Sequence, residues 1–266
     1  MELGINTVLW NGFFKRQGRS FDIHEFLAGA KEAGYDAVEI RGLWQWFDSP
    51  EQAAAAIADA GLRICAWSQG VTLNPYEPNI TEYRKGFAWA QALGLDTITT
   101  CGGFPPERLP EHPASDYDLF ADSLGPAVDL ASEHGLQLCF HPHRGCVVET
   151  ADEMQQMVDR VPALRINVDI AHLAAVGDDA VAFIHRFHDR IGYIHIKDYD
   201  AASGKFATLG EGTGALDPAA CVQALQEHDY AGWWVVEQDV PVDERSPVER
   251  ARVCRDWMQR HLQAPV

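Results

Sequence analysis

The sequence predicts an α/β fold, a single (β/α)8 barrel that spans residues 1–266. Short apolar runs alternate with amphipathic stretches along the whole chain, which is the pattern of parallel strands joined by helices. The length of 266 residues is close to the ~250 residues typical of such a barrel. No GxGxxG motif follows the first apolar run, which disfavours a doubly wound open sheet.

Eight apolar runs have the length and composition of strands. Closing them into a barrel is the simplest way to arrange eight parallel strands. No linker, internal repeat or low-complexity segment interrupts them, so one domain is expected. The predicted strands are residues 2–9, 36–40, 62–67, 95–100, 136–141, 164–170, 191–196 and 232–237.

Helical periodicity fills the gaps between these runs. Pro218 suits a first helical turn, and Asp217 before it is a suitable cap. The longest irregular stretch, 101–115, is predicted to be a rim loop or lid. The predicted helices are residues 22–33, 50–60, 80–93, 116–134, 151–160, 178–188, 217–228 and 246–261. Four of them are followed by a glycine suited to a left-handed helix end, namely Gly34, Gly61, Gly94 and Gly135.

Composition limits the cellular location and the binding partners that we expect for this chain. The chain has 21 Lys and Arg against 39 Asp and Glu, a net charge of −18, so nucleic acid is not an expected partner. No apolar run reaches the roughly 18 residues needed to cross a bilayer, and no signal peptide is apparent at the N-terminus. Six scattered cysteines without a CxxC motif indicate reduced thiols, so we expect a cytoplasmic protein. The oligomeric state is open, and a homo-oligomer is compatible with the sequence.

The last four predicted strands each end in a residue that can bind a metal. These residues are His141, Asp169, His195 and Glu237. In a parallel barrel the C-terminal strand ends meet at one rim, where active sites lie. Two imidazoles and two carboxylates suit one divalent ion (Mn, Co, Fe or Zn), with Mn preferred. Each residue alone has a structural alternative, such as Asp169 capping the next helix, but four at consecutive strand ends favour a metal site.

The second half of the chain resembles the xylose-isomerase-like barrel superfamily of sugar isomerases, epimerases and dehydratases. Within it, the chain is most similar to the inosose (2-keto-myo-inositol) dehydratase-like group. The first half matches only in layout, through the strand ending VEIRG. The resemblance implies that the four residues above are the metal ligands and that His143, His172 and Lys197 surround them. The segments that carry it are FHPHRGCVVET, VDIAHLAAVGDD, IGYIHIKDYD, LGEGTGALD and GWWVVEQDVP.

One ligand position departs from the superfamily pattern. The resemblance places His141 where most members have glutamate, a substitution shared by the inosose dehydratase-like group. In the sugar epimerases two metal-bound glutamates exchange a proton on opposite faces of the substrate, and here only Glu237 remains of that pair. An elimination needs an acid and a base of different pKa, which an asymmetric site supplies more naturally.

The mechanistic hypothesis is therefore a metal-assisted elimination from a cyclic keto-polyol or keto-sugar. The metal polarises the ketone, a histidine or Glu237 removes the α-proton, and a protonated histidine or Lys197 donates to the departing β-oxygen. The same chemistry would expel an alcohol from a 3-keto-glycoside. The predicted catalytic residues are His143, His172, Lys197 and Glu237.

Five further residues are predicted to contact substrate. Glu39 ends the second strand, where it would bond substrate hydroxyls or a histidine. Glu211 lies in a glycine-rich loop expected at the barrel mouth. Aromatic faces stack on sugar rings, which suggests the tryptophans near the first strand ends. The predicted contacts are Trp10, Glu39, Trp67, Arg144 and Glu211.

Three other function classes remain as alternatives. A ketose 3-epimerase or aldose–ketose isomerase would use the same metal site, but His141 disfavours it. An apurinic-site nuclease shares the superfamily, but it needs more ligands and a basic face, and the sequence pI is 4.9. A non-catalytic sugar-binding protein would not require intact ligands at four strand ends.

Overall fold

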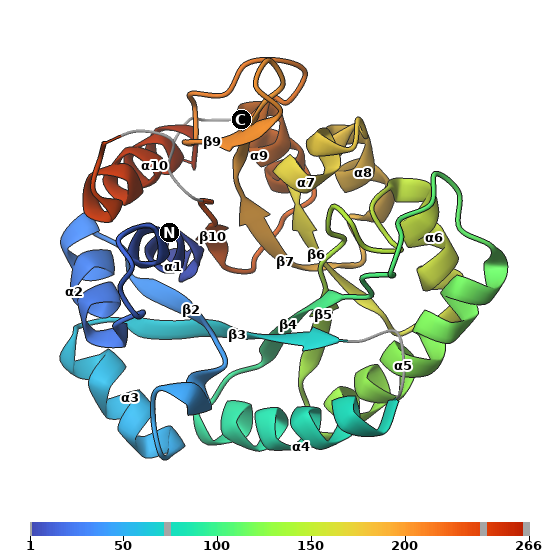
Figure 1. Cartoon of the computed structure of the whole chain (residues 1–266), viewed down its shortest axis with the longest axis horizontal. Helices are drawn as coiled ribbons and strands as arrows, with labels where there is room; N and C mark the ends of the chain where they lie inside the picture. The colour runs from blue at the N-terminus through green and yellow to red at the C-terminus, as the bar shows by residue number, and fades with distance from the viewer. Residues whose placement is uncertain (1, 72–75, 240–243, 263–266) are drawn as a thin grey trace.

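Eight parallel strands close into a barrel, which confirms the predicted fold class (Figure 1). A computed structural model describes residues 2–71, 76–239 and 244–262. The order around the barrel is β1-β10-β7-β6-β5-β4-β3-β2, so each strand pairs with its neighbour in the chain and β10 closes the ring on β1. The barrel strands are β1 Leu3–Asn6, β2 Ala37–Arg41, β3 Arg63–Val71, β4 Thr97–Gly102, β5 Gln137–Phe140, β6 Arg165–Asp169, β7 Ile191–Ile196 and β10 Trp234–Val236.

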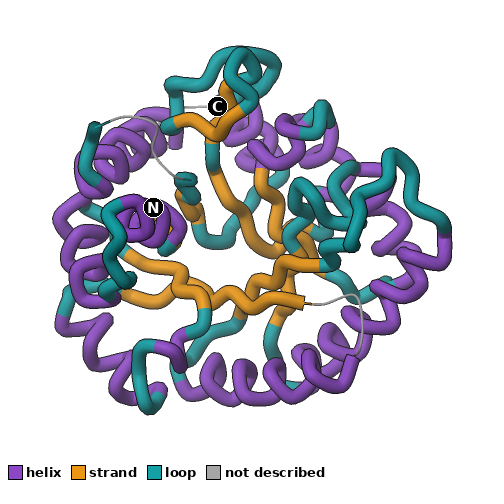
Figure 2. The backbone as a smooth tube through the Cα atoms, in the orientation of Figure 1, coloured by secondary structure: helices purple, strands orange, loops and turns teal. Residues whose placement is uncertain are grey.

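Helices form an outer ring around the strands (Figure 2). The predicted helix ends are confirmed where caps were expected. Asp217 accepts the N–H groups of Ala219 and Ala220, and the four glycines after helices have φ between 67° and 91°. The helices are α1 Val8–Arg16, α2 Ile23–Ala33, α3 Pro50–Asp59, α4 Tyr76–Ala92, α5 Ala114–Glu133, α6 Ala151–Arg160, α7 Ile170–Ala175, α8 Ala180–Phe187, α9 Pro218–Glu227 and α10 Pro247–Leu262, with a short 3-10 turn η1 Leu43–Gln45.

The first predicted strand, 2–9, is too long. β1 ends at Asn6, because the side-chain Oδ1 of Asn6 accepts the N–H of Val8 at 2.7 Å and α1 begins there. Trp10 therefore lies on a helix and is only 2% exposed, with its ring 5.1 Å from that of Phe26. The predicted role of Trp10 in binding substrate is wrong, because its side chain joins α1 to α2 in the core.

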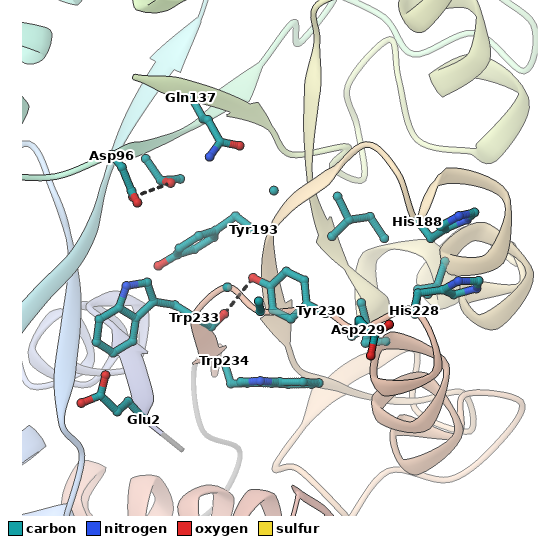
Figure 3. A pocket seen from close by; sticks show the side chains of 17 residues that line it. Glu2, Asp96, Gln137, His188, Tyr193, His228, Asp229, Tyr230, Trp233 and Trp234 are labelled. Carbon is teal, nitrogen blue, oxygen red and sulfur yellow. Dashed lines mark hydrogen bonds between the residues drawn. The ribbon is translucent and has the colours of Figure 1, made fainter. Parts of the chain in front are cut away.

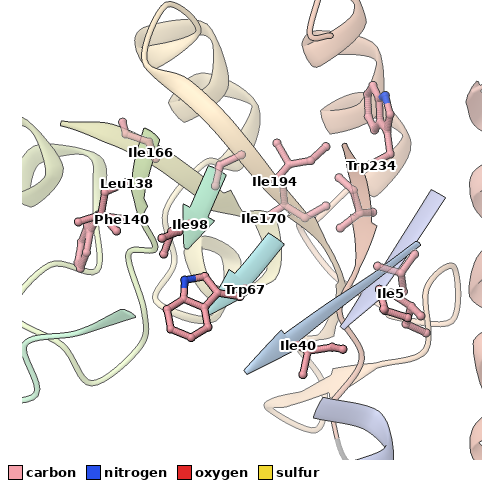
Figure 4. Packing of buried hydrophobic residues seen from close by; sticks show 14 of the residues in the cluster. Ile5, Ile40, Trp67, Ile98, Leu138, Phe140, Ile166, Ile170, Ile194 and Trp234 are labelled. Atoms are coloured by element: carbon pink, nitrogen blue, oxygen red, sulfur yellow. The ribbon is translucent and has the colours of Figure 1, made fainter. Parts of the chain in front are cut away.

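The apolar core lies between the barrel and its helices (Figure 4). Trp67 belongs to this layer. It is fully buried, its ring is 4.2 Å from that of Trp44, and a Cβ at Gly86 of α4 would fall 1.9 Å from it. The predicted substrate contact at Trp67 is also wrong, because the side chain points away from the barrel interior and under α4. Among the described residues, no helix is long and apolar enough to cross a membrane.

Two elements between β6 and α9 were not predicted. The short helix α7 follows β6 directly, and an antiparallel hairpin of β8 Asp198–Asp200 and β9 Lys205–Ala207 follows β7. The carboxylate of Asp198 organises the hairpin loop, because it accepts the N–H groups of Tyr199, Gly210 and Gly212 at 2.7 to 3.0 Å. The predicted loop between β4 and α5 is confirmed and spans residues 103–113.

Candidate metal centre

A hydrogen-bond chain crosses the barrel interior beneath the rim. Glu39 of β2 accepts from His195 Nε2 at 2.7 Å and from Thr99 Oγ1 at 3.1 Å. β2 and β7 are not neighbours in the sheet, so these contacts run across the barrel. Of the two roles predicted for Glu39, the structure shows the histidine contact, and the substrate contact stays a prediction.

His195 is oriented by this chain. Its Nε2 faces Glu39, and its Nδ1 faces Glu237 Oε2 at 3.3 Å and the amide of Asn167 at 3.5 Å. Burial opposes a charge on the imidazole, but Glu39 and Glu237 outweigh it and raise the pKa of His195 to about 9. A metal ion bound at Nδ1 would displace the proton from that nitrogen. A histidine that binds a metal through one ring nitrogen usually donates its other N–H to a carboxylate, as Nε2 does here to Glu39.

Asp169 uses its two carboxylate oxygens differently. Oδ1 caps α7 by accepting the N–H groups of Ala171 and His172 at 2.9 and 3.1 Å. Oδ2 is buried without a hydrogen-bond partner and points toward His141 Nε2, which lies 3.7 Å away. The two interpretations of Asp169, helix cap and metal ligand, are therefore compatible.

His141 presents a second lone pair at the same place. It follows β5, and its Nε2 is also buried without a hydrogen-bond partner. Burial lowers the pKa of His141 to about 3, so the imidazole is neutral at any ordinary pH. A buried imidazole nitrogen and a buried carboxylate oxygen that lack hydrogen bonds are costly, although Lys197 Nζ lies 3.4 Å from the oxygen, and a cation between them would satisfy both. This pair fits a divalent metal ion.

Glu237 completes the set of four predicted ligands. Asn6 donates to its Oε2 at 2.5 Å, and Lys197 donates to its Oε1 at 2.6 Å. Burial opposes ionisation, but Lys197 and His195 lower the pKa of Glu237 to about 2. Asp169 groups with His195 and Glu237, and also with His141 and His172, each group having its ligand atoms within 4.8 Å. The predicted ligands therefore meet at one rim.

Lys197 lies among carboxylates at the edge of this set. Its Nζ is 2.6 Å from Asp239 Oδ2 and 3.4 Å from Asp169 Oδ2, in addition to its bond with Glu237. Burial opposes its charge, but Asp169, Glu237 and Asp239 together raise the pKa of Lys197 well above its ordinary value. Lys197 is thus a protonated hydrogen-bond donor. The negative charge of the three carboxylates around it is larger than the single positive charge of its ammonium group.

His172 and His143 contact each other beside the centre, with ring centroids 3.9 Å apart and ring planes tilted by 36°. His143 Nδ1 donates to the carbonyl of Arg144 at 2.7 Å, so Nε2 is the ring nitrogen available to accept a proton. His172 accepts the N–H of Arg144 at 3.3 Å and lies 3.3 Å from Lys197 Nζ. Burial, then Lys197, lower the pKa of His172 far below its ordinary value, so it acts as a neutral group.

The remaining predicted contacts have different outcomes. Arg144 is exposed at the rim, beside His143, where a substrate contact stays a prediction. Glu211 is instead held by Arg245, whose guanidinium contacts both carboxylate oxygens at 2.6 and 2.7 Å. The predicted role of Glu211 in lining the mouth has no support from these contacts, because its charge is already paired.

Several site residues were not predicted. Asn6 and Asn167 support Glu237 and His195, and Asp239 contacts Lys197. Asp239 follows Glu237 by two residues, so the period of a strand was a usable signal for it. Phe206 of the hairpin covers the site, with its ring centroid 4.4 Å from Lys197 Nζ and 4.7 Å from His172. Its position depends on a hairpin that the sequence pattern does not reveal.

A separate cavity of about 770 Å³ lies at the opposite end of the barrel (Figure 3). Its lining includes Thr97, Gln137, Ile191 and Trp234, which begin four of the strands. That end of a barrel ordinarily serves stability, whereas catalytic groups gather at the C-terminal rim. The cavity is therefore distinct from the metal centre.

Comparison with known proteins decides the family. A family model described as "Xylose isomerase-like TIM barrel" matches residues 27–261. The chain belongs to this family. The xylose isomerase-like assignment agrees with the resemblance inferred from the motifs of the second half.

Curated relatives in this family include two inosose dehydratases. The one from Geobacillus kaustophilus is 26% identical, with 97% of this chain and 94% of the relative covered. The one from Lacticaseibacillus casei is 24% identical, with 100% and 98% covered. Both alignments extend over nearly the whole length of each protein.

Solved structures of the xylose isomerase-like fold superpose well. A protein called IolI, solved with a bound zinc atom, has a TM-score of 0.79 at 18% identity, with 98% of each chain covered. A probable 3-DHS dehydratase, AsbF, from Bacillus anthracis has a TM-score of 0.75 at 16% identity, with 97% and 99% covered. An L-ribulose 3-epimerase has a TM-score of 0.76 at 18% identity, with 99% and 95% covered. At these identities the likeness shows the fold alone.

Proposed function

We propose that this protein is a metal-dependent carbon–oxygen lyase that removes water from a cyclic keto-polyol of the inosose type. The near-full-length similarity to inosose dehydratases supports the substrate class. A 3-keto-glycoside that loses an alcohol is the related substrate for the same chemistry. Of the compatible divalent ions, Mn²⁺ is our preferred assignment.

The asymmetry of the rim carries this proposal. Glu237 is paired with the ammonium of Lys197, which can donate a proton, whereas the imidazoles of His141, His143 and His172 lie beside one another. A proton exchange on two substrate faces would need similar groups on both sides. An elimination instead needs one group that accepts a proton and another that donates one, which these unlike groups supply.

His141, Asp169, His195 and Glu237 would hold the metal ion, which would supply Lewis-acid polarisation of the substrate ketone. His143 Nε2 carries a lone pair and accepts the α-proton. Lys197 donates a proton to the departing β-oxygen, which leaves as water or as an alcohol. When the product leaves, His143 releases the α-proton and solvent restores the ammonium of Lys197. Phe206 excludes water above Lys197 and His172, which strengthens both electrostatic interactions.

Product mass tests the reaction class. Protein loaded with Mn²⁺ or Co²⁺ is incubated in D₂O with 2-keto-myo-inositol and with a panel of 3-keto-glycosides. We expect the keto-inositol to lose the mass of one water. Loss of an alcohol instead identifies a keto-glycoside lyase, and an unchanged mass with deuterium at the α-carbon identifies an epimerase and contradicts the proposal.

Two capping aspartates give a matched control for the metal. Asp179 caps α8 as Asp169 caps α7, accepting two N–H groups, but it lies on the exposed surface. Asp169→Asn keeps a capping oxygen and removes the charge from the metal site, so we expect loss of bound metal and turnover. Asp179→Asn should retain both. Full activity of a metal-free Asp169→Asn protein would overturn the model.

The base is tested separately by His143→Gln. We expect this variant to keep its metal and to lose exchange of the α-proton with solvent deuterium by about 10² to 10⁴ fold. Unchanged exchange would remove His143 from this role and leave His172 or Glu237 as the base.

A further inference from the structure

Two cysteines take no part in the proposed reaction and yet meet at the rim. Cys101 lies near the end of β4, and Cys146 lies in the turn after β5. Together with His143 they offer one ligand atom each within 4.8 Å of one another. Their two sulfur atoms therefore lie within 4.8 Å of each other, with Cys146 buried and Cys101 partly exposed.

The backbone holds this turn in place. Cys146 N–H donates to the carbonyl of His143 at 2.9 Å, and His143 N–H donates to the carbonyl of Val148 at 3.2 Å. Val147 N–H donates to the carbonyl of Gly103 at 3.0 Å, which ties the turn to the end of β4. The three side chains are therefore brought together by fixed backbone on both elements.

We propose that Cys101, His143 and Cys146 form a second metal site, for a thiophilic divalent ion such as Zn²⁺ or Cd²⁺. Two thiolates and one imidazole with an open fourth position are a ligand set that zinc accepts. Zinc bonds of about 2.0 to 2.3 Å place tetrahedral ligands roughly 3.5 Å apart, so the side chains need only small rotations. Mn²⁺ prefers oxygen ligands, so the two thiols disfavour it at this second site.

Metal binding at this second site requires no oxidant. One M²⁺ ion enters, the two S–H groups form two metal–sulfur bonds, and two protons pass to solvent. Burial, and after it the neighbouring Cys101, raise the pKa of the Cys146 thiol far above its ordinary value, so the Cys146 thiol stays protonated until a cation arrives. A coordinating metal deprotonates such a thiol outright.

The second site would compete with the reaction. A neutral imidazole has one lone pair, and a metal bound to His143 uses it. The base proposed for α-proton removal is then lost, and its ring, 5.4 Å from that of His141, carries a cation beside the first centre. Inhibition by a thiophilic metal follows, and this consequence rests on the proposed function.

Thiolate-to-metal charge-transfer absorption tests the site directly, because oxygen and imidazole ligands do not produce it. Mn²⁺-loaded protein, kept reduced with a phosphine, is titrated with Cd²⁺ and with Co²⁺. We expect one ion per chain, a charge-transfer band and two protons released. Cys221→Ser, which alters a buried thiol of α9, should keep the band, whereas Cys101→Ser and Cys146→Ser should lose it.

The outcomes separate this site from the proposed function. No band in the wild type, or a band that persists in both Cys101→Ser and Cys146→Ser, overturns the second site. If Cys146→Ser fails to fold, Cys101→Ser decides alone, because Cys101 is partly exposed. If Asp169→Asn retains the charge-transfer band, the two centres are independent, whatever substrate the protein turns over. If folded Asp169→Asn loses the band, the proposal of a second site is overturned.

Inhibition is measured against the zinc-free activity of each protein. We expect Zn²⁺ to inhibit the Mn²⁺-loaded wild type, and Cys101→Ser to lose most of that inhibition. Equal inhibition of both proteins overturns the regulatory consequence and leaves the charge-transfer result to decide the site.

Discussion

At the scale of single residues, the metal centre depends on side chains beyond the four proposed ligands. Glu39 is buried beneath His195 and fixes which nitrogen of that ring faces Glu237 and Asp169. Thr99 supports Glu39 from β4. The orientation of His195 therefore depends in part on β2 and β4, in the half of the chain that supplies none of the proposed ligands.

Replacing Glu39 with glutamine tests this dependence. Glu39→Gln keeps the shape but lacks the charge that stabilises the Nε2 proton of His195, so we expect metal affinity to fall about 10 to 100 fold with the fold retained. Titration of the chelator-treated protein with Mn²⁺ measures the change. Thr99→Val, which removes only the hydroxyl that supports Glu39, should cause a smaller loss. Unchanged affinity in Glu39→Gln would mean that the ring is oriented by other contacts.

At the scale of elements, the hairpin β8–β9 closes the site over Lys197 and His172. Asp198 fixes the loop that follows the hairpin, and Phe206 extends from β9 over the ammonium group. A cation against an aromatic face in a desolvated site contributes up to about 2 kcal/mol. The hairpin is thus part of the site although it lies outside the barrel sheet.

Phe206→Ala should lower kcat/KM by about tenfold, because the variant admits water and removes the ring from Lys197. Phe206→Leu keeps an apolar cover without the aromatic face and should recover part of the loss. Steady-state kinetics on the substrate identified by product mass provides the measurement. A kcat/KM equal to that of the wild type in Phe206→Ala would show that the hairpin does not cover the reacting atoms.

Two helical glycines give a graded test of how helices pack on the barrel. A Cβ at Gly86 of α4 would lie 1.9 Å from the ring of Trp67, and one at Gly29 of α2 would lie 2.9 Å from that of Trp10. We expect Gly86→Ala to destabilise the protein by about 1 to 3 kcal/mol and Gly29→Ala by less. Urea unfolding gives both values. The reverse order would mean that Trp67 moves more freely than Trp10.

At the scale of the whole molecule, buried thiols link stability to alkaline pH. Burial raises the pKa of Cys65, Cys139, Cys221 and Cys254 to about 12 each. Between pH 9 and 12 the unfolded chain releases these protons while the folded protein keeps them. The free energy of unfolding therefore falls as pH rises through that window, by up to about 1.4 kcal/mol per pH unit for each thiol.

Removing thiols should flatten this dependence. The double variant Cys221→Ala and Cys254→Ala is expected to be less stable than the wild type at pH 8, because it leaves small cavities. Between pH 9 and 10.5, however, it should lose stability less steeply than the wild type. Urea unfolding with reductant present at each pH measures both slopes, and parallel slopes would contradict the assignment.

The sequence was sufficient to predict the barrel, its strand order and the rim at which His141, Asp169, His195 and Glu237 meet, because strand period and chain order determine which residues reach the same end. The errors share a physical cause. Trp10 and Trp67 follow apolar runs as rim residues do, but local turn chemistry at Asn6 and the outward face of β3 place them in the helical layer. The proximity of Cys101 and Cys146 depends on backbone pairing between loops, which no spacing rule expresses.

The two carboxylate oxygens of Asp169 have different roles, which limits the substitutions that this position can accept. One oxygen begins α7 and so positions His172, while the other faces the metal site, so a substitution there changes backbone and chemistry together. His141 has no such second duty, because its free nitrogen faces only the centre. Evolution from one sugar reaction to another can therefore change residue 141 without disturbing a helix, whereas a change at residue 169 also disturbs the start of α7.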